Sequence, residues 1–271
     1  MASYHARSIS LPSRLHPIAE QLDEQLNRLR SSQAASTSFS SVSRQLNGLK
    51  YLYSCVEEFL QLPLHQHIKC VDETLDRSLR LLDICTTFRD VLVNSKLYLQ
   101  DLQSGIRRRC NSDSSIADEA AEYLKSRKII KKTIKKCLQA IKPVLKNGEG
   151  NDEIFLLNDV EAVTVDCFKA LLFYFGGVKA QSTKSRWSTV AKVFNQRPEK
   201  EGSTSEIDAL DATLSLISMK KKTGVNSLEI EDLRSRMVKL VSDIKDFDEL
   251  FECLFRHLVK TRASLLNILS N

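Results

Sequence analysis

Apolar side chains recur three and four residues apart along almost the whole chain, a spacing that gathers them on one side of a helix. The most regular stretch runs from Leu233 to Ile268, where the steps alternate strictly between four and three. Its members are Leu233, Met237, Leu240, Ile244, Phe247, Phe251, Leu254, Leu258, Thr261, Leu265 and Ile268. A heptad stripe this long is typical of a coiled coil between chains or of a long helix in a bundle. Because other long stripes in the same chain can pack against it, we favour the bundle.

The same spacing, with its caps and breaks, predicts where each helix begins and ends. The expected helices cover residues 17–30, 41–62, 68–108, 115–143, 152–175, 207–219 and 227–268, with a short one around 187–194. In the third of these, the stripe includes Leu75, Leu79 and Leu82. The fifth has the highest apolar share, so we predict that it is the central and most buried helix.

The domain organisation follows from the segments that lack this spacing. Residues 1–16 precede the first helix and are predicted to form a flexible tail. Residues 17–271 are predicted to form a single helical-bundle domain. Within it, residues 196–205 combine Pro, Gly, Ser and charged side chains, a composition that predicts a mobile loop.

Composition excludes most other architectures. Of 271 residues only 8 are Gly and 5 are Pro, the residue types on which sheets and turns depend. Apolar residues make up 42% of the chain and charged residues 27%, which suits a packed protein and excludes a wholly disordered one. The prediction is an all-α fold, an elongated bundle of about six to eight long, heptad-patterned helices.

The cysteines and the apolar runs indicate the compartment. The seven cysteines are too far apart for a C-x-x-C pair, which favours reduced thiols in the cytosol or nucleus. The N-terminal segment lacks the apolar run of a secretory signal, and Pro12 and Pro17 would interrupt an amphipathic transit peptide. The longest apolar run, residues 170–175, is far shorter than the ~20 residues of a membrane span. We therefore expect a cytoplasmic protein with no transmembrane helix, and keep membrane association as an alternative.

The helix predicted over residues 115–143 carries the most distinctive charge pattern. Residues 125–146 hold nine Lys and Arg side chains and no Asp or Glu, while apolar residues follow the helical spacing on the other side. The candidate residues for contact with an anionic surface are Lys125, Lys128, Lys131, Lys132, Lys135 and Lys136.

Four interpretations of this basic helix stay open. The simplest is a solvated outer face of the bundle, partly neutralised by Asp159, Glu161 and Asp166 of the following helix. The others are contact with anionic lipid headgroups, with a protein target or with nucleic acid. Nucleic acid is disfavoured because aromatic side chains do not interleave with the lysines.

No motif of catalysis or cofactor binding accompanies this pattern. The chain contains no phosphate-cradling Gly-rich loop, no H-E-x-x-H sequence and no nucleophile elbow. We predict no catalytic residue, cofactor, metal or small-molecule substrate, and a protein that acts through its surfaces on a partner that the sequence does not identify.

Several separated segments resemble, in order, the BYPASS-related family of plant proteins. These are RSISLPSRLHP (7–17), GLKYLYSCVEEFLQLPL (48–64), LDRSLRLLDICTTFRDVL (75–92), VEAVTV (160–165) and LFRHLVKTRASLLNILSN (254–271). The resemblance implies an intracellular helical plant protein linked to root and shoot development, through control of a root-derived mobile signal in its best known members. It implies no defined functional residues. A helical protein-interaction module is the function we expect, with peripheral binding to anionic lipid as the alternative.

Overall fold

The computed structural model of the chain describes seven helices. The described residues are 17–32, 38–62, 71–108, 113–141, 152–177, 205–219 and 226–270. The helices are α1 (Pro17–Ser32), α2 (Phe39–Leu60), α3 (Val71–Arg108), α4 (Asp113–Ala140), α5 (Asp152–Gly176), α6 (Glu206–Met219) and α7 (Ser227–Ser270). Since these residues contain no strand, the all-α prediction is confirmed. The predicted tail, the short helix at 187–194 and the predicted loop, apart from Ser205, lie outside the described residues.

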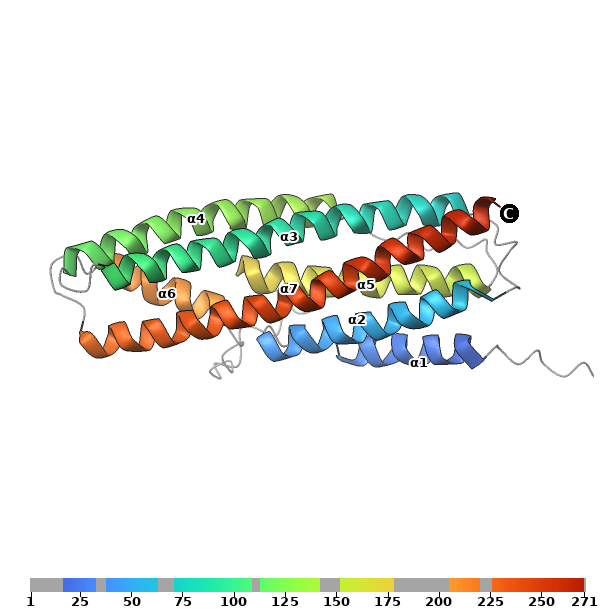
Figure 1. Cartoon of the computed structure of the whole chain (residues 1–271), viewed down its shortest axis with the longest axis horizontal. Coiled ribbons are helices and arrows are strands. Elements are labelled where there is room, and N and C mark those ends of the chain that lie inside the picture. Colours follow the sequence, from blue (N-terminus) through green and yellow to red (C-terminus); the bar gives the residue numbers. More distant parts are fainter. Residues whose placement is uncertain are drawn as a thin grey trace, which may run out of the picture.

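The helices lie side by side along one long axis, so the bundle is elongated (Figure 1). The 38 residues of α3 and the 44 of α7 extend over most of its length. At a rise of ~1.5 Å per residue these helices are about 57 and 66 Å long. α4 runs back along α3 at one outer edge, while α5 lies in the middle and contacts α1, α2, α3 and α4. The predicted central helix therefore occupies the centre.

The regular C-terminal stripe faces the interior of the chain. All of its residues from Leu233 to Leu265 are buried, and Ile268 is partly buried against the core. α7 packs along this side against α2 and α3. The stripe is thus covered by helices of the same chain, as expected for the bundle.

The stripe predicted for α3 is wrong at one position. Leu79 is 46% exposed, and Leu81 is buried in the core instead. Both the series 75, 79, 82, 85 and the series 75, 78, 81, 85 obey the helical spacing. The packing of α3 against its neighbours selects the second series, which local spacing cannot distinguish from the first.

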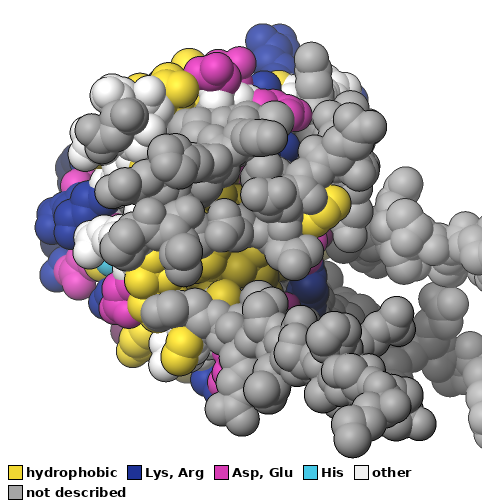
Figure 2. Space-filling model, turned by 90° about the vertical axis from the view of Figure 1, so that its right-hand side faces the viewer, with side chains coloured by type: hydrophobic (Ala, Val, Ile, Leu, Met, Phe, Trp, Pro, Cys, Tyr) yellow, Lys and Arg dark blue, Asp and Glu magenta, His cyan; other side chains and the backbone are white. Residues whose placement is uncertain are grey.

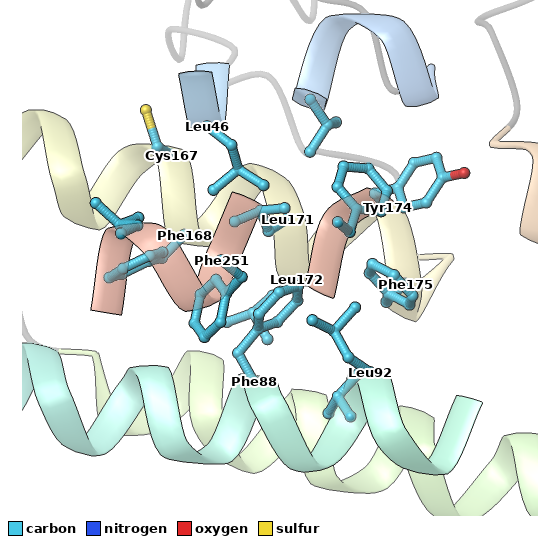
Figure 3. Close-up of a cluster of buried hydrophobic side chains, with 14 of the residues drawn as sticks. Leu46, Phe88, Leu92, Cys167, Phe168, Leu171, Leu172, Tyr174, Phe175 and Phe251 are labelled. Carbon is cyan, nitrogen blue, oxygen red and sulfur yellow. The ribbon is translucent and has the colours of Figure 1, made fainter. Parts of the chain in front are cut away.

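An aromatic cluster joins α3, α5 and α7 at the centre of the bundle (Figure 3). Phe88 of α3 lies 4.9 Å from Phe251 of α7 and 5.5 Å from Phe175 of α5, measured between ring centroids. Phe175 and Tyr174 in turn contact Phe247 of α7, at 5.8 and 5.6 Å. Tilted and edge-to-face rings at these distances stabilise a core beyond the area they bury. The cluster holds the two longest helices on the central one.

The start of α2 is capped by a carboxylate from α6. The backbone N–H of Phe39 donates to Glu206, with distances of 3.3 and 3.2 Å to Oε1 and Oε2. The hydroxyl of Ser38, the N-cap residue, accepts from the backbone N–H of Ser41 at 3.4 Å. A negative charge at this end is favourable because the helix dipole is positive there. The contact joins segments 167 residues apart.

Five cysteines lie in the described ranges, and all are free thiols. Cys85, Cys137 and Cys167 are buried, and Cys55 and Cys253 are half-buried. This agrees with the predicted reduced state for these five. The other two, Cys70 and Cys110, lie outside the described residues.

A buried carboxylate on α7 supplies a pH-dependent prediction. Asp243 is 8% exposed, its Oδ2 has no partner in the described part of the chain, and burial raises its pKa against the opposing charge of Lys239. A raised pKa means that the folded state binds the proton more readily than the unfolded state, so acidification from neutral pH relieves this destabilising charge.

We expect Asp243→Asn to raise the free energy of unfolding at about pH 7 by about 1 kcal/mol, because it removes an unsatisfied buried charge. The gain over the wild type should shrink as the pH falls through the raised pKa. Urea unfolding at several pH values measures both effects. Asp101→Asn, at an exposed position on α3, is the control. If both variants gain the same free energy of unfolding, or if the gain does not depend on pH, Asp243 is not a destabilising buried charge.

Candidate functional site

α4 separates its apolar residues from its lysines. The side that packs against the bundle buries Ile116, Ala120, Tyr123, Ile130, Ile134 and Cys137. The opposite side exposes five lysines, which we call the lysine face: Lys125, Lys128, Lys132, Lys135 and Lys136. Their spacing of three and four residues places them along one side of the helix. They cover eleven helical steps, or about 17 Å at ~1.5 Å each.

One apolar side chain lies within the lysine face. Ile129 is 61% exposed. It is adjacent in sequence to Lys128 and lies one helical turn from Lys125 and Lys132, so lysines surround it on the helix surface. An exposed isoleucine among cations gives this side of α4 a mixed, amphipathic character.

Most of the lysine face has no carboxylate partner among the described residues. Lys125 Nζ lies 2.9 Å from Glu122 Oε2, and both side chains are exposed, so this pair contributes little to stability. No described carboxylate forms an ion pair with the other four lysines. Their charges are therefore available to an external anion.

The three carboxylates of α5 that could partly neutralise the basic helix pair with other cations. Asp159 pairs with Arg30 of α1, Glu161 with Arg77 of α3 and Asp166 with Lys169 of α5 itself, each at 2.9 Å. Partial neutralisation by these residues was part of the solvated-face interpretation. The bundle places them against other cations.

The sixth predicted lysine lies apart from this face. Lys131 is half-buried, and its Nζ lies 2.9 Å from Asp211 Oδ2 and 4.0 Å from Asp208 Oδ1, both on α6. The neighbouring Arg127 is 2% exposed, and its Nε lies 3.1 Å from Asp211 Oδ1. Its Nη2 donates to the backbone carbonyl of Phe175 at 2.8 Å. Arg127 and Lys131 thus join α4 to α6 and to the end of α5.

The end of α5 is shaped to fit this ion-pair cluster. Gly177 has a φ of 64°, a conformation in which other residues are strained. A Cβ at this position would clash with Asp208 Oδ1. Burial raises the pKa of Asp208, and its hydrogen bond with Ser205 and the nearby charge of Lys131 oppose this effect. The close approach of Asp208 explains why a glycine stands at position 177 and why α5 ends there. The ion-pair cluster therefore has a structural role.

A second buried ion pair lies where α2, α3, α5 and α7 meet. Arg77 Nε lies 2.9 Å from Glu161 Oε2, and Arg77 Nη2 donates to Thr74 Oγ1 at 3.2 Å. Burial raises the pKa of Glu161, and this effect outweighs the lowering effect of Arg77. Both side chains line a cavity of about 40 Å³. A cavity of this size has room for about three water molecules at most and is too small for an organic substrate.

The nearby end of the bundle combines apolar and charged side chains. Figure 2 looks at the end where α3 begins and α7 finishes, and shows hydrophobic side chains in the middle with charged ones around them. Residues outside the described ranges, drawn in grey, overlie part of this view. We therefore assign no site to this end.

A groove between α3 and α7 is the second candidate surface, and the sequence analysis missed it. Its volume is about 300 Å³. Leu92 and Ile244 are buried beneath it, while Val93 and Leu97 are 46% and 49% exposed. The signal available in the sequence is that Val93 and Leu97 are apolar and four residues apart, yet fall outside the buried stripe of α3.

The rims of this α3–α7 groove carry opposite charges. Lys96 contributes an ammonium from α3, and Asp248 contributes a carboxylate from α7. An apolar floor between charged rims is a typical arrangement for binding an amphipathic helix.

The described ranges offer neither a metal site nor a membrane-spanning helix. Within the described ranges, no three His, Cys, Asp or Glu side chains are grouped so that they could bind a metal ion. None of the helices in those ranges combines the length and apolar character that a membrane span requires.

Comparison with known proteins identifies a family. No curated protein and no solved structure matches the chain. A family model described as Protein BPS1 matches residues 45–268, from the first turns of α2 almost to the end of α7. This match covers most of the chain and agrees with the resemblance of the separated sequence segments. The chain belongs to the BPS1 (BYPASS1) family, a plant protein family linked to development.

Proposed function

We propose that this protein acts without catalysis, as a helical protein-interaction module in plant development. The observation that carries the proposal is the α3–α7 groove, where Val93 and Leu97 expose apolar surface above the buried Leu92 and Ile244. Isolated exposed apolar side chains are ordinary, but an apolar groove between two long helices provides a contact surface for a partner.

The pairing of the buried charges supports a structural rather than a chemical role for them. Arg127 binds Asp211 and the end of α5, and Arg77 lies against Glu161 beside a small cavity. These contacts join helices to one another. The groove, in contrast, is open to a partner, and its shape and charged rims suit an amphipathic helix that presents apolar side chains to Val93 and Leu97.

Site-specific photocrosslinking in plant root cells tests this function. A photoreactive amino acid at Leu97 should yield adducts of defined mass, whereas the same group at Ser242, exposed on α7 outside the groove, should not. Adding Val93→Glu should reduce the adduct from Leu97 by about tenfold or more, because it places a charge in an apolar contact. The position is half-exposed, so the fold should tolerate the change.

Equal adducts from the two positions, or adducts unaffected by Val93→Glu, would contradict the groove as the contact surface. Complementation of a plant line that lacks the gene provides the functional readout. We expect Val93→Glu to fail and Ser242→Glu to succeed.

A further inference from the structure

We propose that the lysine face of α4 binds the surface of an anionic membrane, with the helix lying parallel to that surface. The proposal rests on α4 and is independent of the α3–α7 groove, so either surface can be tested without the other. α4 lies at an outer edge of the bundle (Figure 1), and its exposed lysines form a row about 17 Å long.

The positive charge of this face is concentrated and unshared. Lys128, Lys132, Lys135 and Lys136 pair with no described carboxylate, and residues 123–140 contain no acidic residue. Each cation close to an anionic bilayer adds about 1 kcal/mol of attraction, or about a fivefold gain in partitioning. Four or five such lysines give a useful affinity even without deep insertion.

The kind of cation favours a membrane over a protein partner. All the exposed cations of α4 are lysines, whereas the only arginine of this helix, Arg127, is turned inward. Lysine is depleted in protein interfaces, where arginine and aromatic residues are enriched. Its compact, hydrated ammonium suits diffuse attraction to many headgroups, while arginine suits bidentate binding of a single carboxylate.

The apolar content of the face also suits shallow contact with a bilayer. Ile129 is 61% exposed among the lysines and can reach the boundary between headgroups and acyl chains. The opposite side of α4 is buried against α3, α5 and α6, so the helix contacts the membrane as part of the bundle and does not insert as a whole. Binding is therefore electrostatic, reversible and weakened by salt.

Vesicle flotation with the full chain tests the proposal. The probes are phosphatidylcholine vesicles with and without phosphatidylserine. We expect the intact chain to float only with the anionic vesicles, and less at high salt. The variant K128Q/K132Q/K136Q should lower the partition coefficient on the order of 100-fold, from about fivefold per lysine. Ile129→Ser, which changes no charge, should lower it several-fold.

The matched control is R44Q/K245Q/K260Q, which removes the same charge from exposed positions on α2 and α7. It should leave partitioning nearly unchanged. Circular dichroism and Tm should be nearly the same for all variants, since the substituted lysines of α4 have no described ion-pair partner. The Lys245–Glu249 pair of the control, at 3.8 Å, is exposed and contributes little to stability. An intact chain that fails to float, or a control that loses as much as the α4 variant, would overturn the proposal. So would binding to immobilised polyglutamate without binding to vesicles, which would assign the lysine face to an acidic protein.

Discussion

Replacing Arg127 by methionine is expected to lower the free energy of unfolding by about 3 kcal/mol. Methionine fills a similar volume, so the loss comes from the interactions of the guanidinium rather than from a cavity. Asp211 would remain largely buried with the half-exposed Lys131 and the hydroxyl of Tyr123 beside it, and the carbonyl of Phe175 would lose its donor. Because Lys131 still offsets part of the charge, the loss should be at the low end for a broken buried ion pair. Urea unfolding followed by circular dichroism measures it.

The double variant R127M/D211L separates the ion pair from general damage to the core. Removing both charges leaves no uncompensated carboxylate, and a buried pair can often be replaced by apolar residues at little cost. We expect the double variant to recover at least half of the loss of Arg127→Met. If Asp211→Leu instead adds a further loss of similar size, the two residues are not coupled.

Replacing Phe175 by alanine is expected to lower the free energy of unfolding by about 3–5 kcal/mol. Phe175 is fully buried and contacts the rings of Phe88, Tyr174 and Phe247. Removing its ring leaves a cavity at the point where α3, α5 and α7 meet, and long helices cannot close around such a cavity without shifting other contacts. Thermal and urea unfolding both measure the effect.

Phe155→Ala, on the same helix, makes the same chemical change at a position that is 40% exposed. We expect the free energy of unfolding to fall by about 1 kcal/mol or less. Folding removes less apolar surface from water at this position, and the substitution leaves little cavity. Similar losses at Phe155 and Phe175 would mean that the aromatic cluster is not the centre of the core.

The helices were largely predictable because their signals are local. Periodic apolar residues and helix caps act over a few residues, and they located α7 with its buried stripe from Leu233 to Leu265. Leu79 shows the limit of this reasoning, because the sequence permits two series of positions with helical spacing and only the neighbouring helices select one. The family was also predictable, since its characteristic segments are continuous stretches of sequence.

The lysine face was predictable only in part. Five of the six candidate lysines lie on the exposed side of α4, as an amphipathic helix requires. Arg127 was counted with the basic residues, although its distance of three and seven residues from the buried Ile130 and Ile134 already placed it on the inward side. That spacing could have revealed its burial.

By itself, the sequence determined that this chain forms long amphipathic helices, that the stripe of α7 is its apolar side, and that α4 is basic, because these properties depend on neighbours within two helical turns. Only the tertiary structure decided which charges are neutralised and where the α3–α7 groove opens. Asp211 reaches Arg127 across 84 residues of sequence, and Val93 and Ile244, which line the same groove, lie still farther apart in the sequence. Such pairs depend on how whole helices pack, and the spacing within one helix carries no information about the charge or volume that another helix brings to it.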